Sequence, residues 1–248
     1  MLRHRETSMP AIFITGTGTD AGKTYFAALL VKALREAGLN AGYYKAAASG
    51  NARDANGRLV AGDAERVAKI AGLSAPPNTL VSYIYEAAVS PHLAARLEGP
   101  PPDLAKIRAD YARICREYAY VVVEGSGGIV CPLRRDGRST LMLPEVIKEL
   151  RLATVIVGTV GLGAINNFVL TAEYLQRRGI VRGLVFNRFR ASGGGAANAL
   201  DDALADTLAN DNMQVIAEIT GLPVWCVLAP DAPKIELTPE WLARIFEE

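Results

Sequence analysis

The chain has 248 residues, of which half are apolar, and its 27 basic residues are balanced by 26 acidic residues. This length is enough to bury the core of one large α/β domain. The balanced charge argues against a nucleic-acid-binding protein. The lack of a long apolar run argues against a membrane span. Because His4 and His92 are the only histidines, a histidine-rich metal site and a Ser-His-Asp triad are not expected.

The N-terminal stretch "MLRHRETS" lacks the apolar segment of a secretory signal. We therefore predict that residues 1–9 form a disordered lead and that residues 10–248 form a single domain. The three cysteines, Cys115, Cys131 and Cys226, are odd in number and lack the spacing of metal ligands. Free thiols in a reducing cytoplasm are the expected interpretation.

From residue 10 onward, short β-rich runs alternate with longer helical patterns. We expect strands near residues 11–15, 41–45, 80–84, 119–123, 153–158, 180–187 and 223–228. We expect helices near residues 23–37, 63–72, 91–98, 103–117, 142–150, 165–178, 197–220 and 238–247. The runs "YVVVEG" and "ATVIVGT" are continuously apolar, which is typical of parallel strands covered on both faces. The predicted fold is therefore a single α/β domain, with a mostly parallel sheet of about seven strands and helices on both faces.

The first predicted strand is followed by a glycine-rich loop, "GTGTDAGKT" at residues 16–24. Its spacing fits two phosphate-binding loops, the dinucleotide fingerprint of a Rossmann fold and the P-loop of a nucleoside-triphosphate-binding protein. The second predicted strand ends in Lys45, where a Rossmann fold requires an acidic residue. Lys23 and Thr24 supply the ammonium and hydroxyl that a P-loop uses to hold phosphates and Mg²⁺. The loop therefore favours a P-loop NTPase-like fold, although it has one more residue than usual before its Gly-Lys pair.

Residues that close the other strands are candidates for chemistry, because ligands bind beyond the carboxyl ends of parallel strands. Lys45 is placed to stabilise an anion that develops near the γ-phosphate, and Ser49 follows it. Glu124 closes an apolar strand, where a P-loop enzyme places an acid that holds Mg²⁺. The stretch "EGSGG" lacks the glycine that a nucleophile elbow needs two residues before its serine. Its glycines are expected to allow close approach of a phosphate or substrate.

Two aspartates have more than one interpretation. From local sequence, Asp63 in "AGDAERVAKIAG" is favoured as the N-cap of a helix, and the alternative is a ligand in the site. Asp20 lies inside the loop, where it either faces a metal or favours the turn.

Taken together, the motifs resemble those of the dethiobiotin synthase family. The resemblance rests on "GTGTDAGKT", "KAAASG" at 45–50, "GDA" at 62–64, "SPH" at 90–92, "VEGSGGIVCPL" at 123–133, "LGAINN" with "LT" at 162–171, and a strand ending in Asn187. It extends in order from residue 10 to about residue 190. The chain departs from the family pattern at Gly18 and Asp20, where the family often has Asp and Glu, and at Ala46, where it has Pro.

The resemblance implies a cyclo-ligase with ATP and Mg²⁺ as cofactors, which closes the ureido ring of dethiobiotin from 7,8-diaminopelargonic acid and CO₂ in biotin biosynthesis. Because the substrate carries its own nucleophiles, the protein has to supply positioning and charge neutralisation. Lys23 and Lys45 are the implied catalytic residues. The implied Mg²⁺ ligands are Thr24, Asp63 and Glu124, and this resemblance moves Asp63 from helix cap to ligand.

The resemblance also implies the binding residues. Those for the nucleotide are Thr19, Asp20, Ala21, Gly22, Lys23, Thr24, Tyr25, Asp63, Glu124, Gly125, Ser126, Gly127, Asn187 and Pro230. Those for the substrate are Ser49 and a helix start formed by Gly163, Ala164, Ile165 and Asn166. In the family the partner chain of a homodimer supplies this helix start, whose free backbone N–H groups receive a carboxylate. The expected partners are therefore small-molecule substrates and a second copy of the chain, with neither nucleic acid nor a membrane.

Two alternative functions use the same fold. Cobyrinate-type amide synthases share the loop, but they need a second domain with a glutaminase Cys and His, for which this chain has no room. A ParA-like ATPase switch carries an additional Lys near the start of its loop, where this chain has Thr17 and Gly18. ATP hydrolysis with and without the diamine distinguishes these functions.

Overall fold

A computed structural model describes residues 10–137, 139–187, 199–229 and 232–246. The predicted disordered lead, residues 1–9, lies outside these ranges. None of the helices in the described ranges is long and apolar enough to cross a membrane.

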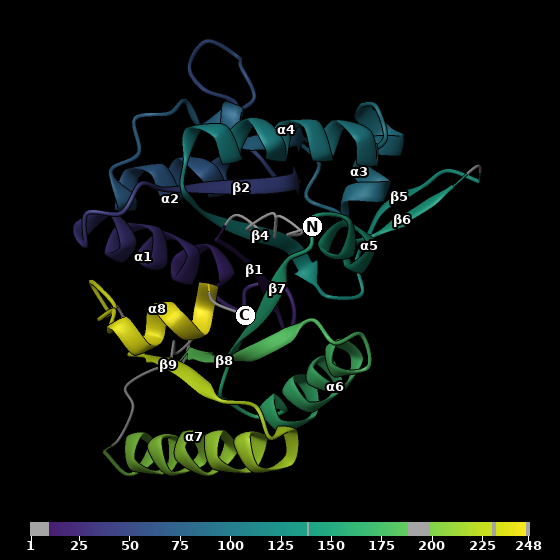
Figure 1. Cartoon of the computed structure of the whole chain (residues 1–248). Helices are drawn as coiled ribbons and strands as arrows, with labels where there is room; N and C mark the ends of the chain where they lie inside the picture. The colour runs from purple at the N-terminus through teal and green to yellow at the C-terminus, as the bar shows by residue number, and fades with distance from the viewer. Residues whose placement is uncertain (1–9, 138, 188–198, 230–231, 247–248) are drawn as a thin grey trace, which may run out of the picture.

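The centre of the molecule is a seven-stranded sheet (Figure 1). Its strands, in spatial order, are β3 (Val81–Ile84), β2 (Ala41–Ala48), β4 (Tyr120–Gly128), β1 (Ala11–Gly16), β7 (Ala153–Thr159), β8 (Val181–Asn187) and β9 (Val224–Leu228). Every neighbouring pair runs parallel. The predicted α/β fold and its parallel sheet are confirmed.

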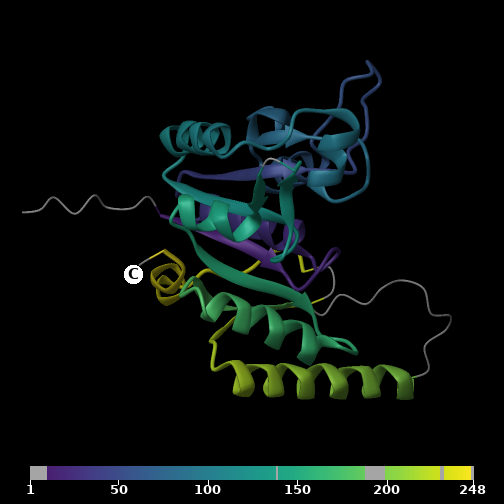
Figure 2. The same cartoon turned by 90° about the vertical axis from the view of Figure 1, so that its right-hand side faces the viewer.

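Helices cover both faces of this sheet. They are α1 (Lys23–Glu36), α2 (Gly62–Ala71), α3 (Pro91–Glu98), α4 (Leu104–Glu117), α5 (Leu143–Glu149), α6 (Ala164–Gln176), α7 (Ala199–Thr220) and α8 (Pro239–Phe246), with a 3₁₀ turn at Pro77–Leu80. On one face α1 packs beside α2, and α8 lies next to β1 (Figures 1 and 2). On the other face α4 packs against β2 and α6 packs against β7. Helix α7 lies outside α6 on this second face. Right-handed crossovers explain the two layers, because the chain runs across the sheet from β1 to β3 in one direction and from β3 to β9 in the other.

The central strands are buried on both faces, as the continuous apolar runs predict for parallel strands. Residues 12–14 of β1 and 121–123 of β4 have no exposed surface, and all of β2 is buried. The large rings of Phe26, on α1, and of Phe13, which lies near Leu143 of α5, are fully buried in this core. Because such a core leaves no room for a ligand between the layers, the loops at the strand ends are the remaining place for a site.

The connections of β1 and β4 diverge, although these two strands are neighbours. The chain leaves β1 into α1 on one face and leaves β4 toward α5 on the other face. This is a topological switch point, the position at which open parallel sheets bind their ligands.

A small antiparallel hairpin, which the sequence did not predict, follows β4. It consists of β5 (Pro132–Arg135) and β6 (Thr140–Met142), and it projects away from the main sheet (Figure 1). Its strands have four and three residues, and their register shifts within the pair. Such short strands show too little alternation of polar and apolar residues to be recognised in a sequence.

Candidate active site

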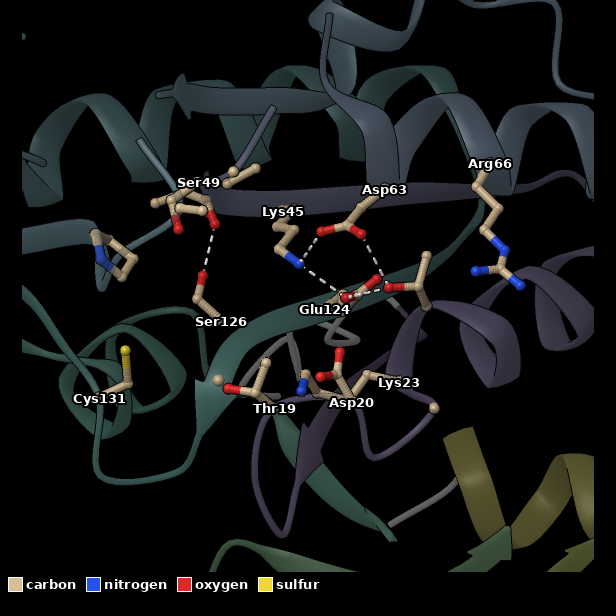
Figure 3. A pocket seen from close by; sticks show the side chains of 18 of the residues that line it. Thr19, Asp20, Lys23, Lys45, Ser49, Asp63, Arg66, Glu124, Ser126 and Cys131 are labelled. Atoms are coloured by element: carbon tan, nitrogen blue, oxygen red, sulfur yellow. Dashed lines mark hydrogen bonds and ion pairs between the residues drawn. The ribbon is translucent and has the colours of Figure 1, made fainter. Parts of the chain in front are cut away.

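A cavity of about 700 Å³ opens at the carboxyl ends of β1, β2 and β4. Its wall is formed by the glycine-rich loop, the loop after β2, the start of α2, the residues before α3 and the end of β4 (Figure 3). The predicted site residues in this wall are Thr19, Asp20, Gly22, Lys23, Thr24, Tyr25, Lys45, Ser49, Asp63, Glu124, Ser126, Gly127 and Asn187. The fold thus brings most of the predicted residues into one cavity.

The glycine-rich loop turns sharply into α1 at Gly22. This residue has φ of 90°, and a Cβ at this position would lie 2.2 Å from Asn187 Nδ2, so the position requires glycine. The first backbone N–H groups of α1 have no helical acceptor and lie beside the cavity, where they form a site for an anion. Lys23 is buried, and its Nζ donates to the backbone oxygen of Gly18 at 2.8 Å. The loop therefore has the features of a P-loop.

Strand pairing brings Lys45 and Glu124 together. The two residues lie opposite each other in the parallel pair of β2 and β4, so their side chains point to the same face of the sheet. Lys45 Nζ donates to Glu124 Oε1 at 2.8 Å and to Asp63 Oδ2 at 2.5 Å (Figure 3). Because Lys45 and Glu124 are only 4% and 1% exposed, the site contains a buried ammonium between two carboxylates.

Asp63 lies in the first turn of α2 and points toward the site. The N-cap of this helix is Ala61, and no side chain caps it. The interpretation of Asp63 as a helix cap, favoured by local sequence, is therefore wrong. Thr24 Oγ1 lies 3.1 Å from Asp63 Oδ1 and 2.9 Å from Glu124 Oε1, close enough to donate to either carboxylate.

The surrounding charges fix the ionisation of these groups. Burial by itself lowers the pKa of Lys45, but Glu124 and Asp63 outweigh burial and raise this pKa above its ordinary value. Burial raises the pKa of Asp63, but the charge and hydrogen bond of Lys45 outweigh it and lower this pKa. Burial and the charge of Lys45 lower the pKa of Lys23. At neutral pH Lys45 is therefore an ammonium and Asp63 a carboxylate.

The cavity also reaches the ends of β8 and β9. Asn187 closes β8, and its Nδ2 donates to the backbone oxygen of Ala21 at 3.4 Å. Tyr25 Oη donates to the backbone oxygen of Ala232, which connects α1 to the segment after β9. Pro230, predicted to contact the adenine, lies outside the described residues.

Some predicted binding residues are not part of the cavity wall. Ala21 is buried beneath the loop, and a Cβ at position 125 would lie 2.9 Å from the ring of Phe13, so Gly125 is required by packing. The helix start formed by Gly163, Ala164, Ile165 and Asn166 also lies away from this wall. In that segment Ala164 is buried, whereas Asn166 is exposed.

Arg66 and Cys131 line the cavity but were not predicted as site residues. The guanidinium of Arg66 lies 5.9 Å from the centre of the Tyr25 ring. The sequence could have indicated Arg66, because it lies three residues after Asp63 and a helix places such residues on the same face. The thiol of Cys131 is buried, which raises its pKa to about 11, so it is protonated at neutral pH.

Tyr43 lies behind Glu124 and was also missed. Its Oη donates to Glu124 Oε2 at 2.8 Å. Burial, together with the charge of Glu124, raises the pKa of Tyr43 well above its ordinary value, so the phenol remains a proton donor. The sequence could have indicated Tyr43, because residues two apart on a strand point to the same face of the sheet and Lys45 lies two residues after Tyr43.

Thr24, Asp63 and Glu124 together fit a magnesium site. Each offers an oxygen ligand, and the Thr24 hydroxyl lies within 3.1 Å of a carboxylate oxygen of each of the other two. Proteins typically hold Mg²⁺ through one or two carboxylates together with substrate phosphates. The adjacent P-loop is placed to bind a nucleotide, which would supply such phosphates.

Comparison with known proteins gives matches at both the sequence and the fold level. A family described as "AAA domain" matches residues 10–236. Two proteins from Clostridium botulinum are named ATP-dependent dethiobiotin synthetase BioD. One is 43% identical over 86% of this chain and 88% of its own length. The other is 41% identical over 96% of this chain and 98% of its own length. A protein of that name from Brachyspira hyodysenteriae is 42% identical over 86% and 89%. The MinC:MinD cell division protein complex of Aquifex aeolicus is similar in fold, with a TM-score of 0.51 and 15% identity over 94% of this chain and 85% of that chain.

Proposed function

The chain belongs to the ATP-dependent dethiobiotin synthetase family, and from this membership we propose that it closes the ureido ring of dethiobiotin in biotin biosynthesis. The substrates are 7,8-diaminopelargonic acid, CO₂ and ATP, and the products are dethiobiotin, ADP and phosphate. The observation that carries the proposal for this site is the buried ammonium of Lys45, held between Asp63 and Glu124 beside the P-loop.

The reaction requires positioning and charge rather than a protein nucleophile. One amine of the substrate takes up CO₂ as a carbamate, whose oxygen attacks the γ-phosphorus while ADP leaves. The second amine then attacks the carbamoyl carbon, the ring closes and phosphate leaves. Lys23 binds the β- and γ-phosphates, Lys45 bridges the carbamate and the γ-phosphate, and Ser49 contacts the substrate.

Magnesium, when bound, neutralises phosphate charge, and Thr24, Asp63 and Glu124 hold it. The variants Asp63→Asn and Glu124→Gln are expected to raise the Mg²⁺ concentration for half-maximal activity by about 10-fold or more, because each removes a charged oxygen ligand. Titration of activity with Mg²⁺ measures this, and Glu65→Gln on the exposed side of α2 is the matched control. If Asp63→Asn lowers the melting temperature but leaves the Mg²⁺ requirement unchanged, Asp63 is not a Mg²⁺ ligand.

The working unit of the proposed function is a homodimer in the cytoplasm. Exposed apolar side chains lie just before α6 and midway along it, with Leu162 91% exposed and Leu170 58% exposed, which supports contact with a second copy. The substrate carboxylate lies at the far end of its carbon chain from the reacting amines, and the α6 start of the partner receives it. All three cysteines are free, which supports a reducing compartment.

The test of the proposed function is the dependence of ATP hydrolysis on the diamine. With Mg-ATP and bicarbonate, we expect ADP and phosphate to form only when 7,8-diaminopelargonic acid is added, with dethiobiotin as the detected product. Rapid ATP hydrolysis that does not change on adding the diamine would instead indicate an ATPase switch.

A further inference from the structure

The carboxylate of Glu124 has different partners on its two oxygens. Oε1 faces the cavity and lies 2.8 Å from Lys45 Nζ and 2.9 Å from Thr24 Oγ1. Oε2 points into the protein and accepts a hydrogen bond of 2.8 Å from Tyr43 Oη. Tyr43 has no exposed surface and Glu124 is 1% exposed, so this bond forms away from solvent.

The hydrogen bond from Tyr43 fixes the orientation of the carboxylate. The terminal torsion of a glutamate is broad, so a carboxylate held at one oxygen only is free to turn. A buried carboxylate oxygen also has to be paired, because an unpaired polar group in the interior is costly. The partners on the cavity side change when a nucleotide enters, whereas Tyr43 lies on β2 beneath the site and does not face the cavity.

We infer that Tyr43 is a positioning residue, which holds Glu124 so that Oε1 is presented to the magnesium ion of the nucleotide. This inference rests on the proposed function only through the assignment of Glu124 as a magnesium ligand. Groups behind a metal ligand typically change metal affinity by about 10–100-fold when they are removed. Tyr43 is expected to act in the same way.

Tyr44 provides a matched control on the neighbouring position of the same strand. Its side chain points to the opposite face, where its Oη lies 2.6 Å from Ser82 Oγ and donates to the backbone oxygen of Ile107 at 3.1 Å. Tyr44 is also fully buried. Tyr44→Phe and Tyr43→Phe therefore remove the same group from equally buried positions, but only Tyr43→Phe removes a contact with the site.

The experiment is calorimetry of β,γ-imido-ATP binding, with Mg²⁺ and with EDTA, on the whole protein. The quantity of interest is the ratio of the affinity for β,γ-imido-ATP with Mg²⁺ to the affinity with EDTA. In Tyr43→Phe we expect this ratio to fall by about 10-fold or more, while the affinity with EDTA is unchanged. In Tyr44→Phe we expect both affinities to match the wild-type protein. Melting temperatures of the two variants report the structural cost of each lost hydroxyl.

Several results would overturn the inference. These are an unchanged Mg²⁺ gain in Tyr43→Phe, an equal loss in Tyr44→Phe, or an affinity loss of the same size in EDTA. The measurement does not use the diamine, so it separates the two proposals. A wild-type protein that lacks diamine-dependent turnover but shows the expected Tyr43→Phe effect would refute the proposed function and leave the inference intact.

Discussion

Replacement of Lys45 by alanine is expected to lower turnover by roughly 100-fold or more and to leave the affinity for ADP nearly unchanged. In the proposed reaction Lys45 contacts the carbamate and the γ-phosphate, and ADP lacks the γ-phosphate. In contrast, Lys23→Ala is expected to weaken ADP binding as well as turnover, because Lys23 lies within the loop that surrounds the β-phosphate. The measurements are steady-state turnover with saturating diamine and calorimetry with ADP.

Two controls separate this effect from a loss of folding. Lys69→Ala removes an exposed lysine of α2 and should change neither quantity. Lys45→Gln removes the charge but keeps most of the side chain and an amide N–H donor, whereas Lys45→Ala also leaves an empty position between Asp63 and Glu124. Equal losses of ADP affinity in Lys23→Ala and Lys45→Ala would show that the two lysines do not have separate roles.

Mixed dimers are expected to recover activity from two inactive parents. In the proposed dimer, Ala164→Asp places a repelling carboxylate at the helix start proposed to receive the substrate carboxylate, and Lys45→Ala disables the phosphate side. A two-fold dimer with one chain of each has one intact site and one doubly damaged site. Refolding an equal mixture should give roughly a quarter of wild-type activity, because about half of the dimers are mixed and each has one good site.

The structure suggests a second variant and a negative control for this experiment. Ala164 is buried, so an aspartate there also disturbs packing, whereas Asn166→Asp changes the charge at an exposed position of nearly the same shape. Refolding Lys45→Ala with Asp63→Asn should give no more activity than the average of the two parents, since both residues belong to the same chain's part of the site. Demonstrated subunit exchange without recovery in the Ala164→Asp and Asn166→Asp mixtures would place the whole site within one chain.

The layers of the fold and one half of the site could be predicted from local sequence patterns. Short β-rich runs that alternate with helical patterns predicted the seven strands, and two of these runs are continuously apolar because central parallel strands are buried on both faces. The P-loop was recognised because a tight turn, a lysine and a hydroxyl are adjacent in sequence, and these local requirements leave a local signature. Lys45 and Glu124 were identified because each closes an apolar strand, and the position of a strand end is also a local property.

Which of these strand ends meet could not be predicted locally, because it depends on the order of the strands in the sheet. β4 lies between β1 and β2, so Lys45 contacts Glu124 across 79 residues of sequence and Tyr43 contacts it across 81. Strand order depends on the crossover connections and on the packing of both helix layers, and a local sequence pattern predicts neither of them. The role of Asp63 changed for the same reason. Its local sequence favours a helix cap, whereas the ammonium that attracts its carboxylate comes from β2, 18 residues earlier in the chain.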